Sequence, residues 1–179
     1  WHKFGNIFMG FLFHHFNDDY DKMIAYMHDL LCVHSKVIPV TTDSAYIQAT
    51  LKDGSIVERQ DNISNVCGYT SPIVRLSLMQ DSRNARHQKS IDTTLMNADY
   101  IILSPWDLYT STISNLIIGD VADLIKKSDA KILFIANTTN KWWETFGYTI
   151  LDFVSEIEKY LWRKVDIIIA NSKHLTLTQ

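Results

Sequence analysis

Glycine and cysteine are scarce in this chain of 179 residues. Only 6 residues are glycine, although average usage of about 7% would give roughly twice as many, whereas 5 are tryptophan. Because glycine is the residue that best tolerates a positive φ, this shortage predicts few tight turns. The two cysteines, Cys32 and Cys67, are too few for a disulfide framework and fit no CxxC metal spacing. We therefore expect a reducing compartment, and specifically the cytoplasm.

A dominant charge and long apolar runs are missing as well. Seventeen Lys and Arg against 20 Asp and Glu give a net charge of −3, so general electrostatic binding to nucleic acid or to an anionic membrane is not expected. Charged residues and histidines interrupt every apolar stretch before the ~18 residues of a membrane span. The histidines show no HExxH or HxH spacing, which predicts no metal site. Trp1 opens directly into a motif, so we expect the chain to start inside a longer protein.

The first half of the chain predicts two helices and then a small antiparallel β section over about 36–80. Residues 5–16 are apolar nearly all round, which predicts a buried helix. Residues 18–31 repeat apolar side chains at helical spacing behind the capping run Asn17 to Asp19. The period then shortens, which predicts strands at 37–40, 45–51, 55–57 and 73–78. A hairpin turn is expected at Asp53 and Gly54.

The second half, over about 98–172, predicts parallel βαβ units and therefore an α/β fold. Short apolar runs alternate with helical segments, which gives strands at 100–103, 132–135 and 165–169 and helices at about 114–128 and 149–161. Strands that are apolar throughout are typical of a sheet covered on both faces, with right-handed crossovers. Small or polar residues follow each strand, so we expect the three strand ends to line one ligand crevice.

Residues 104–111 carry the first candidate chemistry, because they follow a strand and open a helical segment. Backbone N–H groups and the hydroxyls of Thr110 and Ser111 can hold a phosphate at such a position. An ordinary N-cap with a hydroxyl-rich first turn explains the pattern equally well. Asp107 would repel a bare phosphate, so we expect it to meet a ribose hydroxyl, a metal-bound ligand or a backbone amide.

Two further polar groups are candidates for ligand contacts. Residues 137–145 combine carboxamide, hydroxyl, ammonium and carboxylate groups after the next strand, and a sugar or nucleoside could bond to all four. A solvated loop is the alternative. His2 and Asn6 lie one helical turn apart and could face one ligand, or be a surface histidine and a capping asparagine. No GxSxG, GxGxxG or GxxxxGK[ST] motif occurs, which leaves hydrolase, dinucleotide and P-loop chemistry without support.

Four segments together resemble the gluconeogenesis-factor family (YvcK-like proteins), which is related to the 2-phospho-L-lactate transferases. The stretch from His2 to Asn6 resembles G-H-S-[LF]-G-N, and residues 37–41 resemble V-L-P-V-T. Residues 98–116 resemble A-D-x-I-[VI]-x-G-P-G-[SD]-L-Y-T-S-x-x-P-N-L, and residues 137–148 resemble N-x-x-T-x-x-G-E-T-x-G-[YF]. The Leu-Tyr-Thr-Ser element favours the gluconeogenesis-factor branch over the transferase branch.

The resemblance implies a Rossmann-like, three-layer fold, present here as one incomplete domain over 1–179. It also implies binding of a nucleotide sugar of the UDP-N-acetylglucosamine type, in a regulator of carbon metabolism and of cell-wall or cell-shape maintenance that need not catalyse a reaction. A homodimer is possible. The alternatives are a transferase with a guanylated donor and a deazaflavin acceptor, and a fragment that binds nothing. By motif position, the expected ligand-binding residues are His2, Asn6, Ser104, Asp107, Tyr109, Thr110, Ser111, Asn137, Glu144 and Thr145.

The same resemblance allows the tryptophan positions to be compared with those of the family. Trp1, Trp106 and Trp143 stand where the family has glycine, and Trp162 stands where glycine is common. We therefore hypothesise that most of these positions are UGA codons that the source organism reads as glycine. The alternative is a diverged paralogue that has lost its ligand site.

Overall fold

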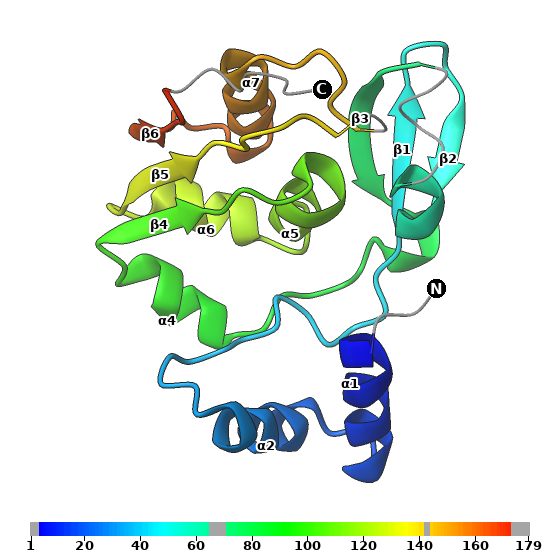
Figure 1. Cartoon of the computed structure of the whole chain (residues 1–179), viewed down its shortest axis with the longest axis vertical. Helices are drawn as coiled ribbons and strands as arrows, with labels where there is room; N and C mark the ends of the chain where they lie inside the picture. The colour runs from blue at the N-terminus through cyan, green and yellow to red at the C-terminus, as the bar shows by residue number, and fades with distance from the viewer. Residues whose placement is uncertain (1–3, 65–70, 142–143, 173–179) are drawn as a thin grey trace, which may run out of the picture.

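The computed structural model describes residues 4–64, 71–141 and 144–172. It contains two three-stranded sheets, an N-terminal pair of helices and further helices in the second half of the chain (Figure 1). One sheet is antiparallel and the other is parallel. The predicted α/β class, with a parallel sheet and a small antiparallel section, is therefore confirmed.

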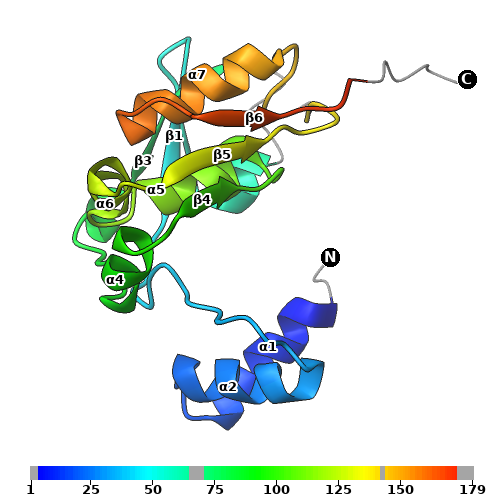
Figure 2. The same ribbon diagram turned by 90° about the vertical axis from the view of Figure 1, so that its left-hand side faces the viewer.

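The helices α1 (Phe4–His15) and α2 (Tyr20–Leu31) form where the sequence predicts them. Asp19 caps α2 by accepting a hydrogen bond from the backbone N–H of Lys22 at 3.1 Å. The prediction that the first helix is buried is wrong, since Leu12 is its only buried residue. The helical pair stands apart from both sheets in Figure 2, so most of the apolar surface of α1 has no neighbour to pack against.

The antiparallel sheet contains β1 (Ile47–Leu51), β2 (Ile56–Glu58) and β3 (Ile73–Leu78) in the order β2-β1-β3. Three of the four predicted strands are thereby confirmed. At the hairpin between β1 and β2, Gly54 adopts a φ of +89°, and the Asp53 carboxylate accepts hydrogen bonds from the N–H and the hydroxyl of Ser55. The predicted strand at 37–40 does not form, because Pro39 removes a ladder donor in the middle of that short stretch.

The parallel sheet contains β4 (Tyr100–Leu103), β5 (Lys131–Ile135) and β6 (Ile167–Ile169) in the order β4-β5-β6. The predicted βαβ arrangement is thus confirmed. Ahead of β4 lie two elements that the sequence did not predict, the short 3-10 turn η1 (Gln80–Ser82) and α4 (Ser90–Met96).

The helical segment predicted at 114–128 is divided into two pieces, α5 (Ser114–Leu116) and α6 (Val121–Lys127). An additional π-helix, η2 (Leu108–Ile113), precedes them. Gly119 breaks the segment with a φ of +49° and lies so close to His87 that a Cβ there would be 2.6 Å from the ring Nδ1. The other predicted helix is confirmed as α7 (Ile150–Leu161), which begins with a capping box of Thr149 and Asp152.

One hydrophobic core joins the two sheets. It collects the inner faces of β1 and β3, one face of β4 and β5, and the apolar stripes of α6 and α7. Phe134 of β5 and Phe153 of α7 stack with their ring centroids 6.5 Å apart. The helices α6 and α7 therefore cover the same face of the parallel sheet.

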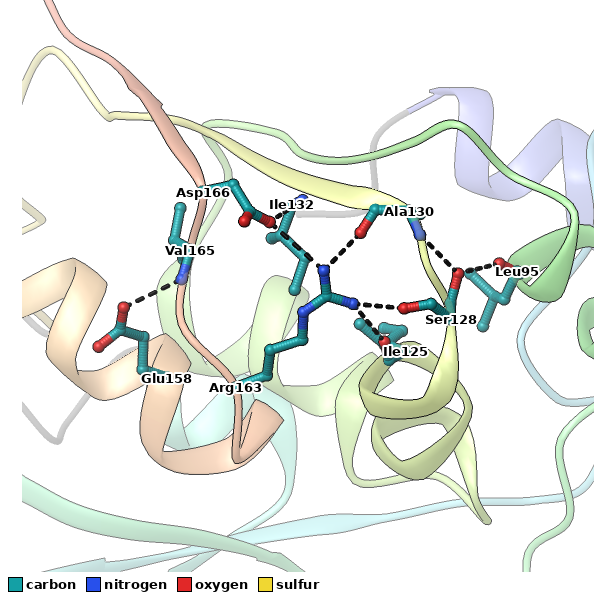
Figure 3. A network of polar contacts seen from close by, with 9 residues as sticks. All are labelled: Leu95, Ile125, Ser128, Ala130, Ile132, Glu158, Arg163, Val165 and Asp166. Carbon is teal, nitrogen blue, oxygen red and sulfur yellow. Dashed lines mark hydrogen bonds and ion pairs between the residues drawn. The ribbon is translucent and has the colours of Figure 1, made fainter.

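Arg163, just after α7, connects three backbone segments at the amino-terminal edge of this sheet (Figure 3). Its guanidinium donates to the carbonyl oxygens of Ile125 at 3.1 Å, Ser128 at 2.6 Å and Ala130 at 2.6 Å. Asp166 accepts a hydrogen bond from the N–H of Ile132 at 2.7 Å. The end of α6, the start of β5 and the approach to β6 are held together by this one network.

Replacing Arg163 with lysine is expected to lower the free energy of unfolding by about 1–3 kcal/mol, because a single ammonium cannot reproduce the planar fork that reaches three carbonyls. Chemical denaturation measures the difference. The adjacent Lys164→Arg, at a side chain that is 89% exposed, serves as the control and should change the stability by less than about 0.5 kcal/mol. Equal effects at both positions would show that the network does not stabilise the fold.

Trp162 ends α7 in the left-handed region, with a φ of 54°, which is the backbone conformation that glycine adopts at helix ends. Trp106 has no such φ, and Trp1 and Trp143 lie outside the described residues. We expect Trp162→Gly to raise the free energy of unfolding by about 1 kcal/mol. Trp162→Ala should not raise the free energy of unfolding, because alanine also has a Cβ and is therefore unfavourable at a positive φ. Thermal denaturation of the three proteins tests this order.

Candidate functional site

The carboxyl ends of the three parallel strands meet at one edge of the sheet, as the sequence predicts. Leu103 pairs with Phe134, and Ile135 pairs with Ile169, so the strands end nearly level. The Asn137 side chain after β5 donates to the carbonyl oxygen of Trp106 after β4 at 3.0 Å. A cavity of about 290 Å³ opens beside these ends, and its lining includes Asn137, Tyr148 and Asn171.

The loop after β4 enters the π-helix η2, which contains Tyr109, Thr110 and Ser111. The N–H of Thr112 donates to the carbonyl oxygen of Asp107 at 2.9 Å, an i to i+5 bond. The Asp107 side chain makes no capping bond and instead pairs with Lys141. The explanation of this stretch as an ordinary N-cap is therefore wrong, and π-helical turns occur frequently at functional sites.

Glu144 is 4% exposed and joins the loop after β5 to this π-helix. Its carboxylate accepts hydrogen bonds from the N–H of Tyr109 at 3.0 Å and from the Thr110 hydroxyl at 2.5 Å. Burial raises the pKa of Glu144, the two hydrogen bonds oppose that rise, and the negative charge of Asp107 adds to it. The carboxylate thus fixes the conformation of both loops.

Tyr109 is completely buried and serves the same framework. Its hydroxyl lies 3.2 Å from the carbonyl oxygen of Ile73, to which it donates, and 2.9 Å from the Tyr148 hydroxyl. Burial is the main cause that raises the pKa of Tyr109. Because this ring spans the space from η2 to β3, it ties the candidate site to the antiparallel sheet.

A second and larger cavity, of about 680 Å³, lies between the antiparallel sheet, α1 and the segment from η2 to α5. It brings Asn6 of α1 to the same space as Thr110, two of the expected ligand-binding residues that are far apart in the chain. Arg59, Asp61 and Asn115 also line it. None of these three was predicted. Arg59 carried no sequence signal, because its place depends on how β2 packs in the folded chain, whereas Asn115 lies inside a motif already recognised.

The remaining expected ligand-binding residues differ in how far they are buried. Thr145 is buried, and its hydroxyl accepts a hydrogen bond from the N–H of Lys141 at 3.0 Å. Ser104 is exposed at the end of β4, and Ser111 is half-buried within η2. His2 lies outside the described residues. Contact with a ligand stays a prediction for all ten.

Within the described residues, no group of three or more His, Cys, Asp or Glu side chains gathers closely enough to hold a metal ion. Over the same residues, no helix has the length and apolar character needed to cross a membrane.

The raised pKa of Glu144 predicts a stability that falls with rising pH. At low pH both the folded and the unfolded chain hold the proton. As the pH rises past the ordinary value of 4.5, the unfolded chain releases it first, so the free energy of unfolding decreases until the folded-state pKa is passed. Glu144→Gln has no such proton, and its carbonyl and amide groups can keep both hydrogen bonds.

We therefore expect the stability of Glu144→Gln to change less than that of the parent between about pH 4 and pH 8, as followed by urea denaturation. Asp123→Asn, at an exposed position of α6, is the control and should keep the parent pH profile. Parallel profiles for the parent and Glu144→Gln would contradict the assignment.

Comparison with known proteins identifies the family. The chain is 32% identical over 172 residues to a putative gluconeogenesis factor of Thermotoga maritima, covering 96% of this chain and 52% of that protein. It is 27% identical to the gluconeogenesis factor of Bacillus subtilis, over 97% of this chain and 53% of the relative. A crystal structure of a UPF0052 family protein from Bacillus halodurans matches with a TM-score of 0.86 at 27% identity, over 99% of this chain and 56% of the other.

The chain thus spans about half the length of these relatives. The family model described as 2-phospho-L-lactate transferase CofD matches residues 1–178. Since that match covers nearly the whole chain, the chain belongs to this family.

Proposed function

We propose that this chain is the part of a nucleotide-sugar-binding regulator of carbon metabolism that holds the ligand. The ligand is of the UDP-N-acetylglucosamine type, and the protein acts in the cytoplasm in cell-wall and cell-shape maintenance, as the resemblance to gluconeogenesis factors implies. The single observation that carries the binding part of the proposal is the 680 Å³ cavity, which gathers a guanidinium, amides and a hydroxyl. Its size suits a ligand of a few hundred daltons.

The cavity groups have complementary roles in this proposal. Arg59 is the cation that faces the diphosphate, since a guanidinium can bond to two phosphate oxygens at once. Asn6 and Asn115 offer both donors and acceptors, which suits sugar hydroxyls and the base. Glu144 and Tyr109 position η2, because both side chains are buried within the framework.

Thr110 has a role that depends on the proton of Glu144. Its hydroxyl carries one hydrogen, which it donates to the Glu144 carboxylate at 2.5 Å. A protonated Glu144 could donate to Thr110 instead, and the threonine proton would then be available for a phosphate oxygen. The raised pKa of Glu144 supports this exchange.

A transferase function is the second candidate, because the matching family model carries the description of 2-phospho-L-lactate transferase. Such an enzyme would use a guanylated donor and a deazaflavin acceptor. The two candidates differ in the base of the nucleotide, so a binding experiment separates them.

Titration calorimetry with UDP-N-acetylglucosamine and with GDP is the test. We expect the uridine ligand to bind and Arg59→Ala to raise its dissociation constant about tenfold or more, because a charge-assisted hydrogen bond contributes roughly 1.5–3 kcal/mol. Arg83→Ala, at another exposed arginine outside this cavity, should leave the constant unchanged. A preference for GDP would favour the transferase, and equal constants for Arg59→Ala and the parent would refute the assigned site.

A further inference from the structure

The chain between η1 and α4 is hydrogen-bonded to residues that line the 680 Å³ cavity. The N–H of Gln88 donates to the carbonyl oxygen of Val40 at 2.9 Å. The Thr41 hydroxyl donates to the carbonyl oxygen of Arg86 at 2.7 Å, and the N–H of Arg86 donates to Asp43 at 2.8 Å. Because Val40 and Thr41 line the cavity, these bonds hold one part of its lining in place.

His87, between those two bonded residues, reaches a second part of the lining. Its side chain is 14% exposed, and its Nδ1 accepts a hydrogen bond from the N–H of Asp120 at 3.2 Å. Gly119 lies directly against the ring, since a Cβ there would be 2.6 Å from Nδ1. Asn115 of α5 and Ile118 of the turn between α5 and α6 line the same cavity. His87 therefore ties two segments of the cavity lining to each other.

The contacts of both ring nitrogens match the neutral form of His87. Because Nδ1 accepts a hydrogen bond from a backbone N–H, it carries no proton. The single proton of the neutral ring then lies on Nε2, which is 2.7 Å from the Asp92 carboxylate of α4 and donates to it.

Protonation of the ring keeps one of these contacts and breaks the other. An imidazolium donates from both nitrogens. Its Nδ1–H would face the N–H of Asp120, so two donors would stand where a donor now meets an acceptor. The contact with Asp92 would persist as an ion pair. The turn before α6 is thereby released from the ring, whereas α4 stays attached to it.

Charged groups of both signs surround His87. Besides Asp92 and Asp120, those that line a cavity of about 570 Å³ together with His87 are Asp21, Lys36, Asp43, Arg86 and Lys89. Among these residue types, histidine is the one that ordinarily changes its charge between pH 5 and pH 8. A pH titration over this range therefore reports on the ring.

We propose that His87 is a positioning residue for the 680 Å³ cavity. Its neutral form holds the two lining segments together, and its protonated form releases the turn that carries Ile118. Ligand binding in the cavity then weakens as the pH falls. This effect on binding rests on the proposed function, whereas the effect on the cavity lining does not.

Two substitutions each keep one of the two ring contacts. His87→Asn places a carboxamide oxygen near the position of Nδ1, where it can accept from the N–H of Asp120, and it has no proton to gain in this pH range. His87→Gln can donate to Asp92 but has no acceptor at the position of Nδ1. His14→Asn is the control, because His14 also lies 3.0 Å from an aspartate but is 85% exposed.

Amide hydrogen exchange followed by NMR tests the positioning without any ligand. Between pH 8 and pH 5.5, the protection factor of the Asp120 amide should fall about fivefold or more in the parent and in His14→Asn, because one hydrogen bond is lost. It should stay constant in His87→Asn and be low throughout in His87→Gln. The same protection factor at both pH values in the parent would overturn the proposal, as would a neutral ring with its proton on Nδ1.

Titration calorimetry with UDP-N-acetylglucosamine at the same two pH values tests the effect on binding. The ratio of the dissociation constant at pH 5.5 to that at pH 8 should be about threefold or more larger for the parent than for His87→Asn. Glu144 titrates in both proteins, so its contribution cancels in this comparison. Equal ratios would overturn the proposed effect on binding. If the parent binds no ligand at either pH, the proposed function fails, and the exchange experiment alone decides the role of His87.

Discussion

The parallel pairing of β4, β5 and β6 in one direction determines most of what this chain can do. Because the strands are parallel, their carboxyl ends share one edge, and the polar residues that follow them are brought together there. Because the order β4-β5-β6 follows the sequence, α6 and α7 lie on one face. The position of the candidate site and the one-sided covering of the sheet by α6 and α7 are therefore two consequences of the same topology.

The buried Glu144 carboxylate converts that shared edge into a defined site. Removing a carboxylate from water is unfavourable, and here hydrogen bonds from the Tyr109 N–H and the Thr110 hydroxyl offset part of the cost. The segment η2 is a π-helix, a rare conformation. The two hydrogen bonds to Glu144 hold this π-helix in place. Tyr109 and Glu144, from the Leu-Tyr-Thr-Ser and Glu-Thr elements, thus hold the framework together, and in our proposal the lining of the 680 Å³ cavity, Thr110 included, meets the ligand.

The sequence predicted those parts of the fold that local patterns determine. The apolar run of β4 and the amphipathic stripe of α7 behind Thr149 are examples, because each signal lies within the element itself. Other predictions about the fold were wrong. The stretch at 37–40 is an apolar run, but Pro39 lies within it and no strand forms there. The helix α1 is apolar nearly all round yet stands apart from the core, because burial depends on neighbours that are distant in the chain.

The same distinction between local patterns and long-range packing applies to the residues of the candidate site. The residues after β4 and β5 were placed at one edge correctly, because parallel topology requires it. The meeting of Asn6 with Thr110 was expected only through the family resemblance, and the contribution of Arg59 was not expected at all. Arg59 has a φ of 71°, and no periodicity in the sequence indicates that an arginine will adopt the left-handed region and turn into the cavity.

The shortage of glycine does not mean that the fold avoids left-handed backbone. Within the described residues, Cys32, Arg59 and Trp162 adopt positive φ, as do Asn17 and Asp18, in which this conformation is more common. A large side chain in this region costs roughly 1–2 kcal/mol. At Trp162 little offsets this cost, since the ring is 75% exposed. The Lys126 ammonium lies 5.5 Å from the ring centroid. Position 162 thus has a backbone conformation typical of glycine and an exposed side chain. A UGA codon that the organism reads as glycine would give this combination. Trp106 has no positive φ, so the backbone gives no such support there.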